Sequence, residues 1–290
     1  MMTRKGIILA GGSGTRLHPL TKSISKHLLP IYDKPMIYYS LSTLMLSNVT
    51  DIAIITTPRD KQSYMDLLGD GSNWGITLTY IIQDKPDGIA QAYLLADNFL
   101  KQEPSVLILG DNIFFGVGLS ELLRNAGSNN IGTTIFCYHV SDPTRYGVIG
   151  LDNNQNVDQI VEKPKEPPSN FAITGLYFFD GNASRYARSI QPSKRGELEI
   201  TSLLEIYQKK KLLKYKLMGR GFAWLDTGTH ASLLDAGEFV KTLQERQGLQ
   251  VGCPEEIAYN KGWIGKKELY DAIQKYEKNA YGKYLKMLIN

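Results

Sequence analysis

The sequence contains little cysteine and no long hydrophobic run. Its 290 residues include two cysteines, Cys137 and Cys253, which lie far apart and outside any CxxC pair. A disulfide framework and a zinc ribbon are therefore excluded, and the scarcity of cysteine fits a reducing compartment. No apolar run approaches the roughly 20 residues that a membrane-spanning helix needs, and no apolar signal core follows the first five residues. We expect a cytoplasmic protein with no membrane partner.

The sequence also lacks a large net charge of either sign. Its 33 lysines and arginines and 29 aspartates and glutamates give a formal charge of +4, which is mild for a nucleic-acid binder, so we expect no nucleic-acid partner. The densest basic cluster, 209–211 with Lys214 and Lys216, falls at the end of a predicted helix, where positive charge is favourable. Hydrophobic residues make up 42% of the chain and charged residues 21%, as is usual for a soluble globular protein.

Short apolar runs alternate with helical patterns over the first 110 residues. This βαβ rhythm predicts an α/β, Rossmann-like fold with a mostly parallel mixed sheet and helices on both faces. The predicted strands are 6–10, 52–56, 76–82 and 106–109, and the predicted helices are 35–47, with Pro35 in the first turn, 60–68 and 88–101.

After residue 133 the pattern changes to strands joined by short turns, which predicts a small extension of the sheet. These strands are expected at 133–139, 148–152, 157–162 and 173–179. Further helices are expected at 118–126, 198–211 and 230–246. The last forty residues have the pattern of short helices. We therefore divide the chain into a main domain, 1–250, and a C-terminal helical appendage, 251–290.

Residues 6–16, GIILAGGSGTR, join the first predicted strand to a glycine-rich turn that ends at Arg16. Glycines let backbone N–H groups approach a phosphate closely. The turn is no P-loop, because no Gly-Lys-Ser/Thr ending follows Gly14. It is no dinucleotide fingerprint either, because Leu17 stands where the third glycine is needed and the strand 52–56 has no carboxylate at its tip. The turn predicts phosphate binding of another kind.

Polar side chains come directly after several of the predicted strands. Gln83, Asp111 and Asp226 each follow an apolar run. In open α/β sheets ligands bind at the carboxyl ends of the strands, where the strand order reverses. We therefore expect these three residues to form one site with the 11–16 turn. The alternative for each aspartate is the cap of a following helix or turn.

Two long motifs resemble the sugar nucleotidyltransferases: L-A-G-G-x-G-T-R-L-x-P-L-T over 9–21, and S-K-x-L-L-P-x-Y-D-K-P-M-I-Y-Y over 25–39. Within that family the chain is similar to members that join dTTP to glucose 1-phosphate. The resemblance implies that 1–250 is the catalytic domain, that the products are dTDP-glucose and pyrophosphate, and that Mg²⁺ is the cofactor. The likeness continues at 68–75, 83–92, 109–112, 145–148, 161–164, 174–177, 195–201 and 223–229.

The resemblance also implies roles for the charged residues. Arg16 is expected to hold the β- and γ-phosphates, Lys26 the α-phosphate and Lys163 the sugar phosphate, while Asp111 and Asp226 hold the metal. The transfer is an attack of a sugar-phosphate oxygen on the α-phosphorus, and catalysis depends on positioning and electrostatics. The phosphate cradle is expected at Gly11, Gly12, Ser13, Gly14 and Thr15.

Uncharged groups are expected to recognise the base and the sugar. Gln83 and Gly88 read the base, since an amide offers both a donor and an acceptor to the imide edge of thymine or uracil. The two bases differ by one methyl group, so partial use of UTP is expected. The sugar contacts implied by the resemblance are Asn112, Gly147, Glu162, Thr174 and Tyr177.

Two positions depart from the family pattern. His27 stands where glutamine is common, so Lys26 is the more reliable ligand of the pair, and Gly150 stands where glutamate is frequent. Alternative functions are a uridylyl- or cytidylyltransferase, or a non-catalytic sensor of nucleotide sugars. The resemblance further implies a homotetramer, feedback inhibition by dTDP-rhamnose at a subunit interface, and a first step toward dTDP-rhamnose and cell-surface polysaccharide.

Overall fold

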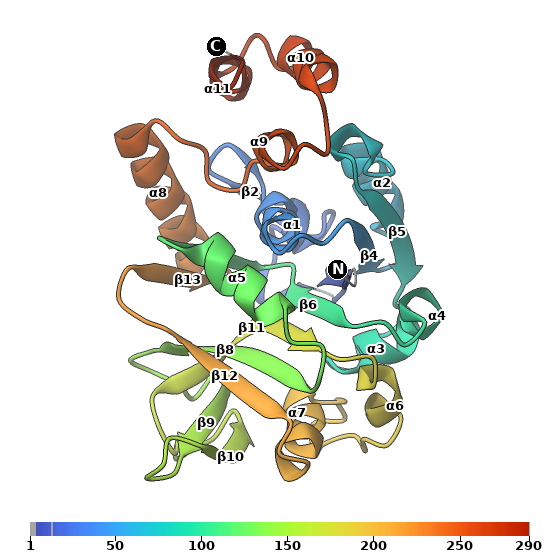
Figure 1. Cartoon of the computed structure of the whole chain (residues 1–290), viewed down its shortest axis with the longest axis vertical. Helices are drawn as coiled ribbons and strands as arrows, with labels where there is room; N and C mark the ends of the chain where they lie inside the picture. Colours follow the sequence, from blue (N-terminus) through green and yellow to red (C-terminus); the bar gives the residue numbers. More distant parts are fainter. Residues whose placement is uncertain (1–3, 13, 290) are drawn as a thin grey trace.

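One sheet of nine strands runs through the computed structural model, which describes residues 4–12 and 14–289. The strands are β1 (Lys5–Leu9), β4 (Asp51–Thr56), β5 (Thr77–Ile82), β6 (Ser105–Leu109), β8 (Thr133–His139), β9 (Gly147–Leu151), β10 (Val157–Glu162), β11 (Phe171–Phe179) and β12 (Leu213–Met218). Their order is β10-β9-β11-β6-β1-β4-β5, with β8 paired to β11 and β12 paired to β8 (Figure 1).

The four early strands form a parallel block, as the βαβ rhythm predicted. Lys5 of β1 lies opposite Asp51 of β4 on one side and Ser105 of β6 on the other. From β1 the chain moves outward to β4 and β5 and then returns to β6 on the opposite side of β1. The strand order therefore reverses between β1 and β6, which places a ligand crevice at their carboxyl ends.

The predicted extension belongs to the same sheet. β11 runs antiparallel to β6, β8 and β9, and β12 adds a parallel strand beside β8. The register of β11 against β8 shifts between Ile173 and Tyr177. The prediction of an α/β fold with a mixed sheet is confirmed.

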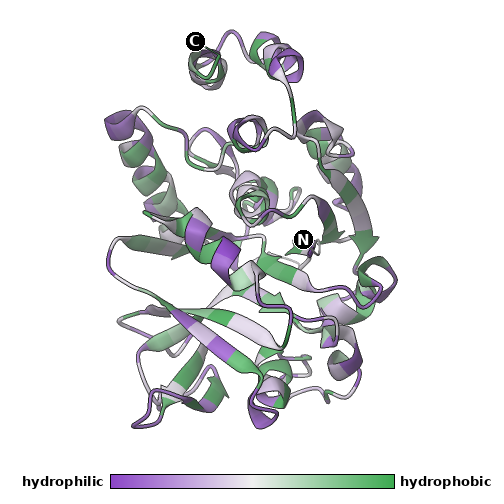
Figure 2. Cartoon of the chain, viewed as in Figure 1, coloured by the Kyte–Doolittle hydropathy of each residue, from purple (hydrophilic) through white to green (hydrophobic). Residues whose placement is uncertain are grey.

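Helices cover both faces of the sheet. Neighbouring residues of a strand point to opposite faces: Ile8 of β1 is buried in the same cluster as Leu41 and Leu123, and Ile7 in the cluster of Tyr93 and Leu203. Figure 2 shows the central strands as hydrophobic and the outer surface of the helices as largely hydrophilic. The covering helices are α1 (Ile37–Leu46), α2 (Lys61–Leu68), α3 (Gln91–Leu95), α4 (Asp97–Leu100), α5 (Leu119–Gly127), α6 (Ala183–Ala187) and α7 (Ile200–Lys209).

Several short elements complete the region around the crevice. β7 (Asn112–Gly116) and β13 (Phe222–Asp226) form an antiparallel ribbon, and β2 (Pro30–Ile31) pairs with β3 (Lys34–Pro35). In the ribbon, Asp226 lies directly opposite Asn112. The 3₁₀ turns are η1 (Thr15–Leu17), η2 (Lys26–Leu28) and η3 (Ser72–Trp74).

The C-terminal part is helical, as predicted. It comprises α8 (His230–Gln247), α9 (Pro254–Asn260), α10 (Lys266–Lys275) and α11 (Ala280–Met287), and α9 to α11 lie at one end of the molecule (Figure 1). Ile257 of α9 and Leu285 of α11 share a buried cluster with Leu41 of α1. Across 4–12 and 14–289, no helix combines the length and the apolar character that crossing a bilayer requires.

Two sequence predictions need correction, and two elements were missed. The helix expected at 88–101 is two short helices, α3 and α4, because the backbone at Ala96 leaves the helical region with φ −87° and ψ 5°. Pro35 is not in the first turn of α1, which begins at Ile37; it pairs with Pro30 in the β2–β3 hairpin. The strand β7 and the helix α6 were not predicted, and β7 proves central to the site.

Candidate active site

The glycine-rich turn follows β1 at the point where the strand order reverses. Gly12 and Gly14 have φ of +102° and +60°, a left-handed backbone that favours glycine. A Cβ at Gly11 would overlap the amide oxygen of Gln83, so the absence of a side chain lets Gln83 approach the turn. Ser13, also predicted in the cradle, lies outside the described residues.

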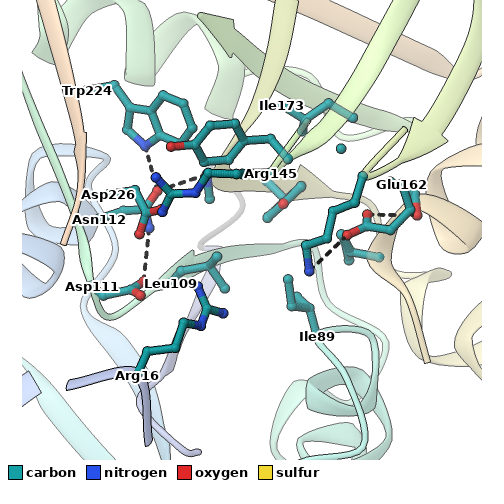
Figure 3. A pocket seen from close by; sticks show the side chains of 17 residues that line it. Arg16, Ile89, Leu109, Asp111, Asn112, Arg145, Glu162, Ile173, Trp224 and Asp226 are labelled. Atoms are coloured by element: carbon teal, nitrogen blue, oxygen red, sulfur yellow. Dashed lines mark hydrogen bonds and ion pairs between the residues drawn. The ribbon is translucent and has the colours of Figure 1, made fainter. Parts of the chain in front are cut away.

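The turn continues into η1, where Thr15 and Arg16 are both exposed. Thr21 Oγ1 donates a hydrogen bond of 2.7 Å to the carbonyl oxygen of Gly14, which ties the turn to the segment that leads toward Lys26. The Arg16 side chain reaches a neighbouring cavity (Figure 3). Arg16 therefore lines the cavity, whereas Gly11, Gly12, Gly14 and Thr15, also predicted in the phosphate cradle, do not.

The cavity is lined by residues from both halves of the sheet (Figure 3). The predicted site residues on its wall are Arg16, Asp111, Asn112, Gly147, Glu162, Lys163, Tyr177 and Asp226. The remaining wall residues are Ile89, Leu109, Arg145, Tyr146, Ile173, Gly175, Ile200, Thr201 and Trp224.

Asp111 and Asp226 reach this cavity from different elements. Asp111 lies between β6 and β7, and Asp226 is the last residue of β13. The ammonium group of Lys26 donates to Asp111 Oδ2, and Arg145 Nη2 lies 3.6 Å from Asp226 Oδ2. Each carboxylate therefore faces a cation of its own.

The surroundings shift the two carboxyl groups in opposite directions. Burial raises the pKa of Asp226, and the charge of Asp111 raises it further. Nearby cations such as Lys26 and Arg145 lower that pKa, but they offset the increase only in part. Burial also acts to raise the pKa of Asp111, but the charge and hydrogen bond of Lys26, together with His27 and the Asn112 hydrogen bond, outweigh it and hold that pKa well below its ordinary value. Asp226 is thus a partly buried carboxylate whose neighbouring cations do not fully offset the effect of burial on its pKa.

The two aspartates fit a divalent cation that arrives with a phosphate substrate. Mg²⁺ in such sites takes one or two carboxylates together with phosphate oxygens and waters. Among the residues that the structure describes, no three His, Cys, Asp or Glu side chains gather as a complete metal site. The alternative of a helix cap does not apply to Asp226, because Thr229 is the N-cap of α8 and accepts the N–H of Ser232 at 3.2 Å.

Asn112 connects the aspartates to the rest of the wall. Its Oδ1 accepts hydrogen bonds from Trp224 Nε1 at 2.6 Å and from the N–H of Gly175 at 3.1 Å. Its Nδ2 donates to Asp111 Oδ1 at 3.0 Å. Asn112 therefore fixes the position of Asp111 in addition to lining the cavity.

Glu162 and Lys163 lie at the end of β10, on the opposite wall. Thr201 Oγ1 donates to Glu162 Oε2 at 3.2 Å, while Lys163 Nζ and Arg195 Nη1 lie 3.5 and 3.6 Å from Glu162 Oε1. Burial raises the pKa of Glu162, an effect that Lys163 partly offsets. Lys163 has a left-handed φ of +44° and its N–H donates to the carbonyl oxygen of Tyr146 at 2.9 Å. These contacts hold a cation and an acceptor side by side.

The predicted base-reading residues do not line the cavity, and of the two only Gln83 is seen to contact the turn. Gln83 is buried, and its Nε2 donates to Gln91 Oε1 at 2.7 Å. Gly88 has φ of +109°, and a Cβ there would overlap the backbone of Leu198. Close packing of the 83–90 segment against Leu198 therefore requires glycine at position 88.

Outside the turn and the base-reading segment, two more predicted residues, Lys26 and Thr174, do not line the cavity. Lys26, in η2, contacts Asp111 but is not part of the cavity wall. Thr174 lies on β11 between two wall residues, Ile173 and Gly175, and since alternate strand residues face opposite sides, its side chain is buried away from the cavity. The Thr174 hydroxyl has no hydrogen-bond partner among the described residues. The structure gives no support to Thr174 as a sugar contact.

His27 is buried behind the site, with 3% of its surface exposed. Its Nδ1 lies 3.2 Å from both Ser25 Oγ and Tyr64 Oη, and a Cβ added to Gly110 would press on the imidazole at 2.7 Å. Burial, and secondarily the charge of Lys26, lowers the pKa of His27 to about 3. The side chain is thus a neutral support beneath Lys26 and Gly110.

Sequence reasoning gave no role to Arg145, Tyr146 and Trp224, which form one side of the cavity. The rings of Tyr146 and Trp224 are 5.0 Å apart, and the Arg145 guanidinium lies 5.8 Å from the Tyr146 ring. All three fall within segments that carry the family resemblance, 145–148 and 223–229. That placement is the signal that would have identified them.

Known proteins are similar to this chain along almost its whole length. The chain is 56% identical over 288 residues to the glucose-1-phosphate thymidylyltransferase of Xanthomonas campestris pv. campestris, covering 99% of this chain and 98% of the relative. It is 51% identical to that of Neisseria gonorrhoeae and 48% to that of Mycobacterium tuberculosis, each covering 98% of this chain and 99% of the relative.

Solved structures and a family model agree with these relatives. A Bacillus anthracis protein assigned as a glucose-1-phosphate thymidylyltransferase, solved with sucrose, superposes with a TM-score of 0.76 at 41% identity, covering 82% of this chain and 95% of its own. A UDP-glucose pyrophosphorylase with bound UDP-glucose shares the fold, with a TM-score of 0.74 at 24% identity, 83% of this chain and 99% of its own. The nucleotidyl transferase model matches residues 5–242. This chain, with its glycine-rich turn, aspartate pair and cationic walls, belongs to the nucleotidyl transferase family of enzymes.

Proposed function

We propose that this protein transfers dTMP from dTTP to α-D-glucose 1-phosphate, giving dTDP-glucose and pyrophosphate. The observation that carries the proposal is the set of relatives of that name, 48–56% identical over nearly the full chain. The cavity supports it, because cations stand on both walls and two carboxylates stand at the reversal of strand order. Both substrates are polyanions, and these cations would screen their repulsion.

Arg16 and Lys26 would act on the nucleotide phosphates. A sugar-phosphate oxygen forms a bond to the α-phosphorus while the bond from that phosphorus to the bridging oxygen of pyrophosphate breaks. The Arg16 guanidinium, exposed beside the glycine turn, suits the departing pyrophosphate because its fork of donors matches phosphate oxygens. Lys26, with its ammonium group at Asp111, is placed to stabilise charge at the α-phosphate.

The opposite wall would hold the sugar phosphate. Lys163 supplies a positive charge there, and Glu162 an acceptor for sugar hydroxyls. Asn112 has one N–H left after its bond to Asp111, and Gly147 and Tyr177 complete the wall. The turn 11–15 would cradle the triphosphate, with Gln83 and Gly88 at the base.

Asp111 and Asp226 would hold the divalent metal, which we propose is Mg²⁺. When bound, it would neutralise phosphate charge and help align the reacting groups. We expect the carboxylate of Asp226 to attract the metal more strongly than that of Asp111, because the protein's own cations only partly compensate its negative charge.

We further propose that the protein is a cytoplasmic homotetramer and that dTDP-rhamnose inhibits it. Its reaction would be the first step toward dTDP-rhamnose and cell-surface polysaccharide. A second cavity supports a regulatory site, because it lies between the β7–α5 region and the C-terminal segment and is lined by Phe114, Ser120, Cys253, Glu256 and Lys261 among others. Size-exclusion chromatography with light scattering tests the assembly. A 32.5 kDa species at micromolar concentration would contradict it.

A pyrophosphate-release assay tests the reaction. Wild-type protein with Mg²⁺ is given each of dTTP, UTP, CTP and ATP with glucose 1-phosphate or galactose 1-phosphate. We expect the highest kcat/KM with dTTP and glucose 1-phosphate, weaker use of UTP, and loss of at least about a hundredfold in kcat for Lys26→Ala. Preference for a purine nucleotide, or no turnover with any pair, would refute the proposal.

A further inference from the structure

Arg145 lines the cavity but has no part in the function proposed above. It lies on the loop between β8 and β9, which is anchored on both sides. The N–H of Tyr146 donates to Pro143 O at 3.1 Å, the Tyr146 ring packs on Trp224, and Lys163 N donates to Tyr146 O. The backbone is therefore fixed while the Arg145 side chain remains 45% exposed.

Positive and negative side chains balance in the ligand-free cavity. The reactants add several negative charges, of which one divalent metal neutralises only two. Binding both reactants therefore requires that some cationic side chains of the protein leave their carboxylate partners when the metal binds those carboxylates. These side chains can then bind phosphate. The cationic wall residues are Arg16, Arg145 and Lys163, and the anionic ones are Asp111, Glu162 and Asp226.

The contact between Arg145 and Asp226 is looser than the one between Lys26 and Asp111. At 3.6 Å it exceeds the length of a hydrogen bond, and half-exposed ion pairs contribute little to stability. Lys26, by contrast, is hydrogen-bonded to Asp111 and only 21% exposed. In Figure 3 the Arg145 side chain extends across the cavity toward Asp226.

We propose that Arg145 is the counterion of Asp226 in the ligand-free enzyme and moves to the phosphate of the sugar 1-phosphate when the metal takes Asp226. This inference rests on the proposed function for the identity of the phosphate ester. A guanidinium suits the second position, because its paired donors bind two phosphate oxygens at once. The exchange involves no covalent step. It links metal binding to the capture of the second substrate.

Titration of the protein with Mn²⁺ alone, followed by the electron paramagnetic resonance of free Mn²⁺, tests the first half. Arg145→Gln removes the competing cation, so we expect it to bind Mn²⁺ about two- to fivefold more tightly than wild type. Arg145→Lys keeps a charge and should bind Mn²⁺ nearly as wild type does. Arg188→Gln is the matched control, since it breaks an exposed Arg–Asp pair with Asp97, outside the cavity.

Calorimetric binding of glucose 1-phosphate in the presence of Mn²⁺ tests the second half. We expect Arg145→Gln to weaken it about tenfold, and Arg188→Gln to leave it unchanged. Mn²⁺ affinity that is equal or weaker in Arg145→Gln, or unchanged sugar-phosphate affinity, would overturn the inference. Neither readout requires turnover, so a failure of the proposed thymidylyl transfer is seen separately, in the pyrophosphate-release assay.

Discussion

At the scale of single residues, the two aspartates of the cavity contribute oppositely to folding. Asp111 has a hydrogen-bonded ammonium partner, and its charged form is stabilised by the fold. Asp226 is a partly buried carboxylate whose pKa is raised, so its charged form is costly to the folded state. The fold tolerates this cost at a position where the proposed metal would bind.

Asparagine at the two positions should therefore have opposite effects on stability. Asp111→Asn leaves Lys26 without its anion and should lower the free energy of unfolding by about 2 kcal/mol. Asp226→Asn should raise it at pH 7, because the costly charge is gone. Chemical unfolding measures both, and both variants should lose at least about a hundredfold in kcat.

The gain from Asp226→Asn should depend on pH. An acid with a raised folded pKa destabilises the fold above that pKa and ceases to do so once protonated, so the gain should shrink as the pH falls through the raised pKa of Asp226. A gain that grows on acidification, or an Asp226→Asn variant less stable than wild type at pH 7, would contradict this assignment.

His27 provides a second test of pH dependence. It stays neutral in the folded protein, with its pKa lowered to about 3, whereas in the unfolded chain it takes up a proton near pH 6.5. Stability is therefore lost as the pH falls below 6.5. Between pH 7.5 and 5.5, wild type should lose about 1.4 kcal/mol relative to His27→Gln, which cannot be protonated. Urea unfolding at both pH values measures this difference. If the free energy of unfolding changes equally with pH in wild type and His27→Gln, His27 is not buried as described.

At the scale of elements, the site depends on close approaches that only glycine allows. The absence of a side chain at Gly11 lets Gln83 approach the glycine-rich turn, and the absence of one at Gly88 lets the backbone of Leu198 approach the segment that follows Gln83. The 83–90 segment is thus held between the turn after β1 and the loop that joins α6 to α7. Substitutions here should act on both the fold and the proposed nucleotide site.

Gly88→Ala should destabilise the protein by about 1–3 kcal/mol, because φ of +109° is strained for alanine and its Cβ meets Leu198. The KM for dTTP should rise while the KM for glucose 1-phosphate changes little. The matched control is Gly219→Ala, whose Cβ would meet no atom within 4 Å. Equal behaviour of the two variants in unfolding and in KM would argue against this role for Gly88.

Local patterns predicted some of these elements and missed others for physical reasons. The apolar runs of β4 and β6 have a length and composition typical of buried parallel strands, and their positions were predicted to within one residue. β7 begins directly after Asp111, two residues beyond the end of β6, and pairs with β13, far along the chain. No pattern in the neighbouring sequence predicts that pairing or the hydrogen bond from Trp224 to Asn112, because the partners lie far apart in the chain. The aspartates were identified because they follow strands, whereas Arg145 lies on a loop whose position depends on Trp224.

At the scale of the whole molecule, Lys34 ties the N-terminal hairpin to the C-terminal part. Its buried ammonium group donates to Asp33, Gln244, Gln250 and the carbonyl oxygen of Val251 at 2.6–3.1 Å. Burial lowers the pKa of Lys34, and Asp33 partly offsets this. One side chain thus joins the β2–β3 hairpin, the end of α8 and the segment that leads into α9.

Lys34→Met should therefore destabilise the whole protein. Removing one partner of a buried charge pair leaves Asp33 and two glutamine oxygens without their donor, and we expect a loss of about 3 kcal/mol. Proteolysis should then cut first near residue 250. Lys278→Met, at an exposed position, serves as the control. Unchanged stability of Lys34→Met would show that packing alone joins the β2–β3 hairpin to the end of α8 and the segment that leads into α9.

A crystal structure of the protein with dTDP-glucose and Mg²⁺ tests the central claim most directly. The account predicts the diphosphate against residues 11–16 and Arg16, the metal between Asp111 and Asp226, and the glucose beside Glu162 and Lys163. A nucleotide sugar bound in full occupancy at any other place, with this cavity empty, would contradict it.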